Sequence, residues 1–285
     1  MAEAGKFAGK TILITGAGSG IGKATALYLA KHGASLSLCD ISATNLDTVA
    51  DEITNSFPET TVFTQTVDVT KPDDVQKWVE ASKEKFGQFQ GCVNCAGLTS
   101  KHHLIADIDI EEWNTVIGVN LTGTFNSLKY ESIHVADGGS IVNIASIFGL
   151  YGSAYAAPYV ASKHAVIGLT KSAAIENAAR GVRVNAVCPA WVKTPMIMDY
   201  AKDLQARGVE FQQTYPNQLF KRIMDPEEVT SVIVFLLGDE SKFITKAAYE
   251  ISGGRAAKRA PKYKATDARG ATVSTETPEM GRDET

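Results

Sequence analysis

Short apolar runs alternate with amphipathic stretches along most of the chain. Residues 11–14 (Thr-Ile-Leu-Ile) are apolar and rich in branched side chains, which is typical of a buried parallel strand. Residues 23–32 then place apolar side chains at helical spacing, and Gly33 is a typical helix stop. Further strands are expected at 34–39, 61–63, 91–93, 140–144, 182–187 and 248–251. Such alternation of strand and helix predicts an α/β fold with a parallel sheet.

The pattern continues as one unit up to residue 254. A chain of 285 residues can form one large α/β domain or two small ones. Neither a linker nor an internal repeat interrupts residues 1–254, so we predict a single domain, a doubly wound parallel sheet flanked by helices. A helix is predicted to start at Asp225, with Pro226 in its first position and Glu228 as the acid of a capping box.

A glycine-rich turn follows the first predicted strand. Thr15 to Gly22 reads T-G-x-x-x-G-x-G, which differs from G-x-G-x-x-G because Ile occupies position 21. Glycines let the backbone approach a pyrophosphate, and the start of the next helix offers free N–H groups and partial positive charge. In the order strand, turn and helix, this segment predicts a dinucleotide site.

Tyr159 and Lys163 are four residues apart in a predicted helix and therefore lie on one face of it. A phenol has a pKa of about 10, and a nearby ammonium group favours the phenolate and lowers that pKa. A tyrosine in this setting can exchange a proton with an alcohol or a ketone near neutral pH. Ser146, thirteen residues upstream at the end of a predicted strand, is placed to hold the reacting oxygen.

From about Lys10 to Gly254 the chain resembles the short-chain dehydrogenase/reductase family. Cys95 and Ala190 depart from the family's usual residues, and both replacements are small. The motifs that carry the resemblance are, in chain order, Thr15–Gly22, Asp40, Asp68-Val69, Asn94-Cys95-Ala96-Gly97, Asn120, Ser146, Tyr159 with Lys163, and Pro189-Ala190 with Val192 and Thr194.

The resemblance implies a Rossmann-like fold and a Tyr-Lys-Ser-Asn mechanism for an alcohol/ketone oxidoreductase. Tyr159 would be the acid/base, Lys163 would lower its pKa and hold the nicotinamide ribose, Ser146 would stabilise the substrate oxygen, and Asn120 would hold a water. The implied cofactor contacts are Gly16, Ser19, Gly20, Ile21, Gly22, Asp40, Asp68, Val69, Asn94, Ala96, Gly97, Tyr159, Lys163, Pro189, Val192 and Thr194. Relatives of this kind are usually homodimers or homotetramers.

The predicted cofactor is NAD. Asp40 would hydrogen-bond the adenosine ribose hydroxyls and repel a 2′-phosphate. Ile41 follows at a position where a phosphate-binding enzyme often carries Arg, and Ser19 is likewise not basic.

Residues 193–222 form a long connection, which predicts a lid. Its apolar and aromatic side chains are typical of an adaptable wall. They are Met196, Ile197, Met198, Tyr200, Phe211, Tyr215 and Phe220, of which Phe211 and Phe220 are expected to pack the lid onto the core. Tyr151 and Tyr155 would line the opposite side, and Trp191 and Met196 would touch substrate. A bulky, mostly apolar, uncharged substrate is predicted: alicyclic, terpenoid, steroid-like or polyketide, as in secondary metabolism.

Composition excludes several other functions. The net charge is −4 with no basic stripe, which disfavours nucleic acid, and no apolar run is long enough for a membrane span. The amino terminus lacks the apolar region of a signal peptide. Cys92 and Cys95 have C-x-x-C spacing, but without a second such pair we expect buried thiols and no metal site. A cytoplasmic location is expected.

Three points stay open: the class of function, the state of the tail and the position of a histidine pair. A non-redox cyclase or a cofactor-dependent regulatory binding protein could use the same scaffold. The polar tail, 255–285, is expected either to be disordered or to dock as a strap on a neighbouring subunit. The pair His102-His103 either faces substrate or lies in a solvated loop. The physiological substrate, the direction of reaction and its stereochemistry are beyond the sequence.

Overall fold

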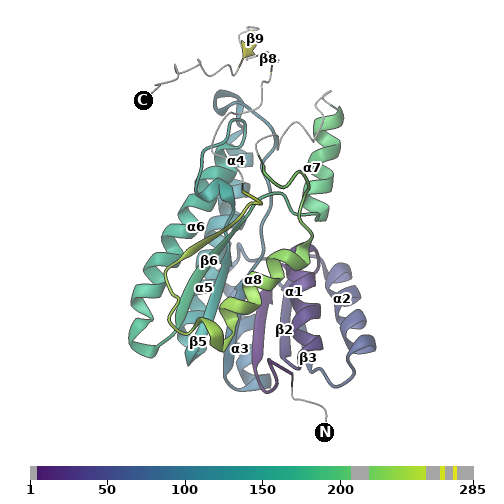
Figure 1. Cartoon of the computed structure of the whole chain (residues 1–285), viewed down its shortest axis with the longest axis vertical. Helices are drawn as coiled ribbons and strands as arrows, with labels where there is room; N and C mark the ends of the chain where they lie inside the picture. Colours follow the sequence, from purple (N-terminus) through teal and green to yellow (C-terminus); the bar gives the residue numbers. More distant parts are fainter. Residues whose placement is uncertain (1–4, 207–217, 255–263, 267–271, 275–285) are drawn as a thin grey trace.

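A seven-stranded parallel sheet forms the centre of the molecule (Figure 1). The structure, a computed structural model, describes residues 5–206, 218–254, 264–266 and 272–274. The sheet has the strand order β3-β2-β1-β4-β5-β6-β7. The strands are β1 (Thr11–Thr15), β2 (Ser35–Asp40), β3 (Val62–Thr66), β4 (Phe89–Asn94), β5 (Val135–Ile144), β6 (Arg183–Pro189) and β7 (Ala248–Ile251). The predicted doubly wound, Rossmann-like fold in a single domain is therefore confirmed.

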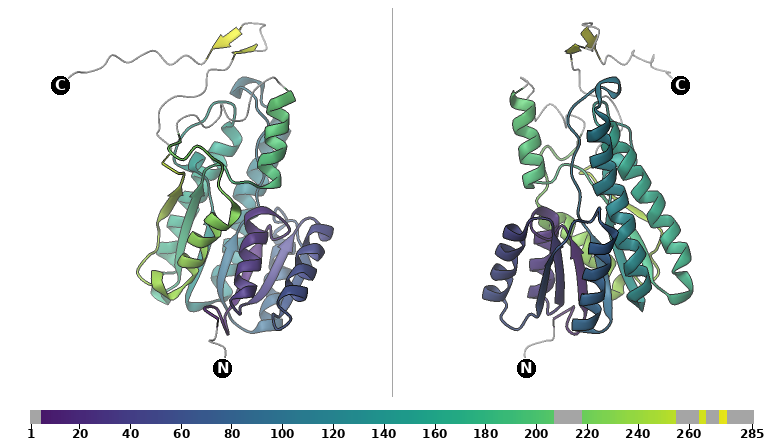
Figure 2. Two further views of the ribbon diagram at one scale, coloured as in Figure 1. Left: turned by 45° about the vertical axis from the view of Figure 1, so that its right-hand side comes forward. Right: turned by 180° about the vertical axis from the view of Figure 1, so that it is seen from behind.

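Helices cover both faces of the sheet (Figure 2). One face carries α1 (Gly20–Lys31), α2 (Ala43–Ser56) and α8 (Pro226–Leu237), and the other carries α3 (Pro72–Phe86), α5 (Gly123–His134) and α6 (Ala157–Glu176). Two further helices, α4 (Ile110–Ile117) and α7 (Pro195–Ala206), lie beyond the carboxyl ends of the strands. The molecule thus has three layers, with the sheet between two layers of helices.

Side chains on the two faces of the sheet pack into different apolar clusters. Along β1, Ile12 and Ile14 pack against α1, α2 and α8, while Leu13 between them packs into the core beneath α3 and α5. Successive side chains of a strand point to opposite faces, so a strand covered on both sides is apolar at most positions on both faces. This explains why the strands read as continuous apolar runs.

The predicted start of α8 is confirmed. The carboxylate of Glu228 accepts a hydrogen bond from the Asp225 N–H at 2.9 Å, and Pro226 occupies the first turn. Arg222 donates to both oxygens of Glu228, at 2.6 and 2.7 Å, and these hydrogen bonds lower the pKa of Glu228 to about 2. The connection before α8 is therefore fixed at its downstream end.

Three segments differ from the prediction or lie beyond it. Helix α1 begins at Gly20, three residues before the predicted 23, because the glycine turn itself supplies the first helical turn. Part of the predicted lid is a regular helix, α7, and residues 207–217, with Phe211 and Tyr215, lie outside the described residues. In the tail, β8 (Lys264–Thr266) and β9 (Thr272–Ser274) pair antiparallel, and the rest is not described.

None of the described helices has the length and apolar character needed to cross a bilayer.

A chain of buried hydrogen bonds joins the central strands to two helices on one face of the sheet. Glu131 of α5 is fully buried, and its carboxyl group accepts a hydrogen bond from Asn94 Nδ2 at 2.9 Å. The same nitrogen donates to Asn143 Oδ1 at 2.9 Å, and Asn143 Nδ2 donates to Thr170 Oγ1 at 2.9 Å. The chain thus connects β4 and β5 with α5 and α6. Burial raises the pKa of Glu131 to about 7, although its hydrogen bonds with Asn94 and Cys92 oppose the rise.

Replacement of Glu131 by Gln should change how stability depends on pH. The folded protein holds the Glu131 proton up to a pKa of about 7, whereas the unfolded chain releases it near 4.5. The folded state therefore binds the extra proton between these values, and stability falls as the pH rises through them. The shift corresponds to about 3 kcal/mol. Glu131→Gln should remove this loss, so urea unfolding should favour the variant over the wild type more at alkaline than at acidic pH.

The control is Glu84→Gln, which removes an exposed carboxylate from α3. Its stability should follow the wild type at both pH values. Identical pH dependence in Glu131→Gln and the wild type would show that Glu131 does not hold its proton as described.

Candidate functional site

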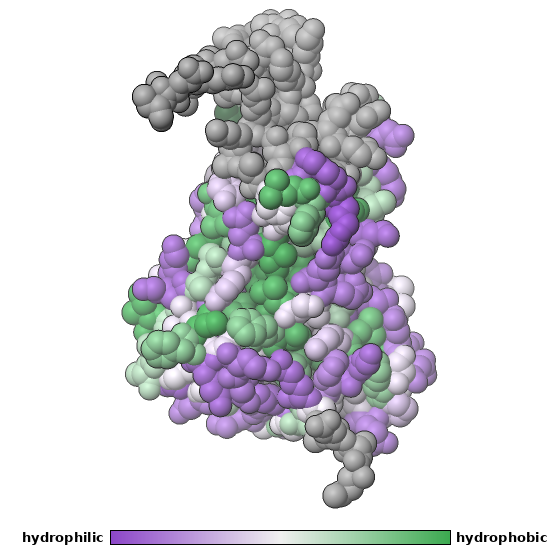
Figure 3. All heavy atoms as spheres, viewed as in Figure 1, coloured by the Kyte–Doolittle hydropathy of each residue, from purple (hydrophilic) through white to green (hydrophobic). Residues whose placement is uncertain are grey.

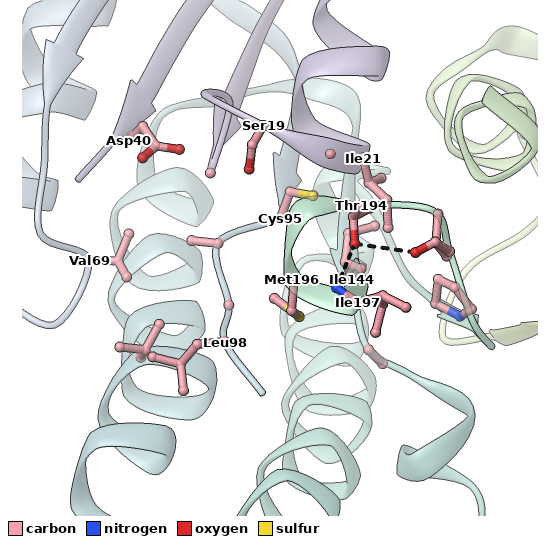
Figure 4. A pocket seen from close by; sticks show the side chains of 18 of the residues that line it. Ser19, Ile21, Asp40, Val69, Cys95, Leu98, Ile144, Thr194, Met196 and Ile197 are labelled. Carbon is pink, nitrogen blue, oxygen red and sulfur yellow. Dashed lines mark hydrogen bonds between the residues drawn. The ribbon is translucent and has the colours of Figure 1, made fainter. Parts of the chain in front are cut away.

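A cavity of about 360 Å³ opens at the carboxyl ends of the strands. It lies where the strand order reverses between β1 and β4, which is the usual ligand site of doubly wound sheets. Figure 4 shows Asp40 and Val69 on one side of it and Thr194 and Ile197 on the other. The predicted site residues that line it are Gly16, Ser19, Gly20, Ile21, Asp40, Asp68, Val69, Ala96, Gly97, Tyr159, Lys163, Pro189, Val192, Thr194 and Met196.

The glycine turn is packed tightly against the segment after β4. Gly16 has a φ of 64°, and a Cβ on it would lie 2.7 Å from the backbone nitrogen of Ala96. A Cβ on Gly22 would lie 2.2 Å from the carbonyl oxygen of Gly16. Thr15 Oγ1 accepts hydrogen bonds from the N–H groups of Cys95 and Ala96 at 3.1 and 3.2 Å. Side chains at either glycine would force the turn away from the cavity wall.

The start of α1 faces the same cavity. Ser19 precedes the helix and makes no side-chain capping hydrogen bond, and Gly20 and Ile21 line the cavity with it. The first N–H groups of a helix have no partner within the helix and carry partial positive charge. This turn therefore fits a pyrophosphate.

Asp40 is fixed at the end of β2. Its Oδ2 accepts a hydrogen bond from the Gly18 N–H and its Oδ1 from the Ser42 N–H, both at 2.9 Å. Ile41 beside it is 71% exposed and also lines the cavity. Among the described lining residues Lys163 is the one cation, so the Asp40 end of the cavity has acidic and neutral groups alone.

Asp68 and Val69 form the next part of the wall. Asp68 Oδ1 accepts hydrogen bonds from the N–H and the hydroxyl of Thr70, at 2.9 and 2.7 Å. The carbonyl oxygen of Val69 accepts a hydrogen bond from Asn126 Nδ2 at 2.8 Å. These contacts hold the segment after β3 against α5 and beside the cavity.

Tyr159 and Lys163 line the cavity, and Ser146, which is not part of its lining, hydrogen-bonds Tyr159. The Lys163 side chain is buried, its Nζ donates to the carbonyl oxygen of Ile144 at 2.8 Å, and it lies 5.6 Å from the centre of the Tyr159 ring. Ser146 is buried at the end of β5, where its hydroxyl oxygen accepts from the Phe148 N–H at 3.1 Å. The structure brings together three residues that lie on a helix and a strand end.

The pKa values of this group differ from the prediction. Burial raises the pKa of Tyr159 above its usual range, and the hydrogen bond with Ser146 offsets only part of that rise. Burial also lowers the pKa of Lys163 to about 8. Desolvation is the largest cause of the Tyr159 shift and Lys163 is not among its causes, so the expected lowering by Lys163 does not appear in this structure.

Asn120 lies in a π-helical turn, Gly118–Thr122, between α4 and α5. Its side chain is fully buried: Oδ1 accepts from the Leu98 N–H at 2.8 Å, and Nδ2 donates to the Leu98 carbonyl oxygen at 2.9 Å and to Ser162 Oγ at 3.1 Å. Its backbone carbonyl oxygen accepts from Thr124 Oγ1 at 2.7 Å. The side chain thus holds the segment after β4 in place, a function that the sequence did not indicate.

Several predicted residues lie outside the cavity wall. Gly22 packs behind the turn, and Asn94 belongs to the buried chain of hydrogen bonds in the core. Trp191 and Tyr155 are buried near the cavity without lining it. The sequence missed several apolar lining residues, which adjoin the motifs and carry no polar signal of their own: Val67, Leu98, Val119, Ile144, Ala145 and Ile197.

The four cysteines are free thiols. Cys92 is buried in β4 as expected, and Cys95, just after that strand, lines the cavity. Burial raises the pKa of Cys92 well above its usual value and that of Cys95 to about 12, so both are poor nucleophiles. Within the described ranges, no group of three His, Cys, Asp or Glu side chains could hold a metal ion.

Both ends of the predicted lid are fastened together. Val192 and Met224 form a parallel bridge, with hydrogen bonds from Lys193 N to Met224 O at 2.8 Å and from Met224 N to Trp191 O at 2.9 Å. Helix α7 rises from this closed base and brings Met196 to the cavity.

Comparison with known proteins agrees with this geometry. Residues 16–256 match a family model described as enoyl-(acyl carrier protein) reductase. The short-chain dehydrogenase/reductase aba4 of Botryotinia fuckeliana is 40% identical over 251 residues, covering 87% of this chain and 97% of that protein. Cyclohexanol dehydrogenase of Acinetobacter sp. is 40% identical over 255 residues, covering 89% and 97%.

Solved structures give the same result. The crystal structure of levodione reductase has a TM-score of 0.82 at 34% identity, covering 87% of this chain and 98% of that one. NAD+-bound xylitol dehydrogenase has a TM-score of 0.82 at 32% identity, covering 87% and 100%. The chain therefore belongs to the short-chain dehydrogenase/reductase family, whose members are oxidoreductases that use nicotinamide cofactors.

Two glycine variants should separate backbone strain from packing at the turn. Gly16 and Gly87 have φ values of 64° and 76°, but a Cβ on Gly87 meets nothing within 4 Å. Gly87→Ala should therefore lose only about 1 kcal/mol from strain. Gly16→Ala should lose about 1–3 kcal/mol more, because its Cβ overlaps the segment after β4. Urea unfolding measures both. Equal losses would contradict the close packing described.

Proposed function

We propose that the protein is an NAD(H)-dependent oxidoreductase that interconverts a secondary alcohol and a ketone on a bulky, mostly apolar substrate. The observation that carries this proposal is that Tyr159, hydrogen-bonded by Ser146, and Lys163 line the same cavity as a glycine turn and Asp40. Neither set of residues alone would define a redox enzyme.

The cavity fits a dinucleotide along its length. The Gly16 turn and the start of α1 would receive the pyrophosphate, and Asp40 would receive the adenosine ribose hydroxyls. Asp68 and Val69 would flank the adenine, while Val192 and Thr194 would face the nicotinamide. A bound nicotinamide supplies or accepts the hydride, and the protein supplies position and proton transfer.

Tyr159 would donate or accept the proton at the reacting oxygen. Because burial raises its pKa, the hydroxyl carries its proton at neutral pH, which suits donation to a ketone. Ser146 would hydrogen-bond the same substrate oxygen and hold it beside the phenol. Lys163, with a pKa of about 8, is charged at neutral pH and would hold the nicotinamide ribose. Asn120 would act by positioning Leu98 rather than by touching the reacting atoms.

The preference for NAD follows from charge. A 2′-phosphate would lie near the Asp40 carboxylate, and Ile41 and Ser19 offer it no positive partner. The solved relative with bound NAD+ supports this assignment.

An apolar substrate follows from the residues beside Tyr159. Ala190, Val192, Met196 and Ile197 line this part of the cavity. The names of two relatives, cyclohexanol dehydrogenase and levodione reductase, are consistent with a cyclic substrate, whereas a third, xylitol dehydrogenase, indicates a polyol. The apolar lining favours the first kind. The gathering of three chemically competent residues favours an oxidoreductase over a regulatory binding protein or a cyclase.

Association into a homodimer or homotetramer is also proposed. Phe125 and Ile133 on α5 and Ile175 on α6 are large apolar residues exposed on the outer surface. On the face shown in Figure 3, apolar side chains also gather in a strip bordered by polar ones. Exposed apolar area of this kind is typical of association surfaces. The remaining proposal is a cytoplasmic location; apart from β8 and β9, the tail, 255–285, lies outside the described residues.

The cofactor preference can be tested at one carboxylate. The wild type should have a kcat/KM at least about tenfold larger with NAD than with NADP, which corresponds to 1.4 kcal/mol of repulsion. Asp40→Asn keeps an oxygen to accept from the Gly18 N–H but removes the charge. The ratio of kcat/KM with NAD to kcat/KM with NADP should therefore fall towards one. A wild-type enzyme that prefers NADP would overturn the assignment.

The catalytic proposal can be tested with Tyr159→Phe, which keeps the ring and removes the proton-carrying oxygen. We expect turnover to fall at least about a hundredfold while NADH still binds. Nicotinamide absorbance with a panel of cyclic alcohols, sugars and short hydroxy acids measures turnover, and the cyclic alcohols should give the larger kcat/KM. Normal turnover in Tyr159→Phe would refute the mechanism, and a preference for the small polar compounds would refute the substrate class.

A further inference from the structure

Six aromatic rings form an unbroken chain of contacts that begins at the candidate catalytic tyrosine. They come from five segments: the turn after β5, the start of α6 with the residues before it, the turn after β6, α7, and the segment after β4. In order of contact they are Tyr159, Phe148, Trp191, Tyr200, His102 and Tyr155. The five rings after Tyr159 are called the aromatic wall below.

Phe148 joins Tyr159 to the wall. Its ring centroid lies 6.4 Å from that of Tyr159 at an interplanar angle of 88°, and 6.1 Å from that of Trp191 at 86°. Edge-to-face contacts of this kind are favourable, because the positive edge of one ring meets the negative face of another. The wall therefore begins in direct contact with the phenol proposed to transfer the proton.

Tyr200 connects α7 to both halves of the wall. Its ring stacks on Trp191 with centroids 5.7 Å apart, and its hydroxyl lies 3.2 Å from His102 Nδ1. His102 in turn stacks on Tyr155 with centroids 4.3 Å apart. One side chain of α7 thus contacts the segment after β6 and the segment after β4, on opposite sides of the site.

Tyr155 is held in a disfavoured backbone conformation. Its φ is 64°, a region that bulky residues rarely adopt, and its side chain is 6% exposed. A glycine would adopt this backbone without strain, so the packed ring compensates for the strain. Strained residues of this kind cluster at ligand sites.

The wall adjoins the lining of the cavity without being part of it. Trp191 lies between two lining residues, Ala190 and Val192. On α7, Met196 lines the cavity, and Tyr200 is one helical turn further on the same side. The wall is therefore next to the lining at Trp191 and Tyr200.

We propose that the aromatic wall selects a cyclic, uncharged substrate, and that the contact of Tyr200 with His102 holds α7 in the position that completes this wall. This inference rests on the proposed function and adds the shape of the substrate to it. A rigid ring presents a broad apolar face to aromatic side chains, whereas an open chain presents less area and loses rotamer freedom when it binds. A charged group would leave water for a surface of aromatic faces and edges.

The test compares two alcohols of equal carbon number, cyclohexanol and 2-hexanol, with NAD. Their apolar content is similar, so the ratio of their kcat/KM values reports shape. Wild type should favour cyclohexanol. Trp191→Leu keeps apolar bulk but removes the ring, and the ratio should fall about tenfold, mainly through the KM of cyclohexanol. An unchanged ratio would overturn the inference.

The clasp between α7 and the segment after β4 needs a double-mutant cycle. Tyr200→Phe keeps the stack on Trp191 and removes the hydroxyl, and His102→Phe keeps the stack on Tyr155 and removes the nitrogen. Each should lower the ratio severalfold, and the double variant should lower it no further than either single one. His103→Gln is the matched control, since His103 contacts Glu112 at 3.1 Å and not the wall. Fully additive effects, or an equal effect of His103→Gln, would refute the clasp.

Equilibrium binding separates this inference from the proposed function. Titration of the enzyme with bound NADH by cyclohexanone and by 2-hexanone measures the same preference without turnover. If the wild type oxidises neither alcohol, the proposed function fails, and tighter binding of cyclohexanone that Trp191→Leu abolishes still supports the wall. If the wild type oxidises both alcohols and binds both ketones equally, the wall fails and the proposed function stands.

Discussion

The contact on which this structure depends most is the close approach of the first glycine turn to the segment after β4. Thr15 holds the N–H groups of Cys95 and Ala96, and Gly16 leaves no room for a side chain between them. This contact lies where the strand order reverses. Asp40 and Tyr159 line the same cavity, in which we propose that a dinucleotide binds.

Most of the fold was predictable because its determinants are local. Buried parallel strands are mostly apolar, and the capping residues of α8 have a sequence pattern of their own. Most motif residues were predictable for the same reason, since they lie at or just after strand ends, as the glycine turn, Asp40 and Ser146 do. The aromatic wall was not, because its rings come from five segments and no periodicity relates Trp191 to Tyr200 or His102. The burial of Glu131 was also hidden, since a charged residue on a helix normally faces solvent.

The same desolvation acts on three groups with different consequences. Glu131 holds its proton to higher pH, Tyr159 does so too, and Lys163 gives its proton up more readily. Sequence spacing indicated the attraction between Tyr159 and Lys163 but could not indicate the depth at which both lie. In this structure desolvation is the largest cause of the pKa shift of each group. The chemistry of the pair is therefore set by the layers around it as much as by its spacing.

The bridge between Val192 and Met224 has an evolutionary consequence. It closes the base of the segment that carries α7, so the positions of the strands do not depend on how many residues lie between Val192 and Met224. Lengthening such a loop costs little, because closure entropy grows only with the logarithm of its length. Insertions, deletions and wholesale exchange of this segment can therefore accumulate without disturbing strand register. The segment that we propose to contact substrate can therefore change in sequence and length while the sheet and the residues at its strand ends stay the same.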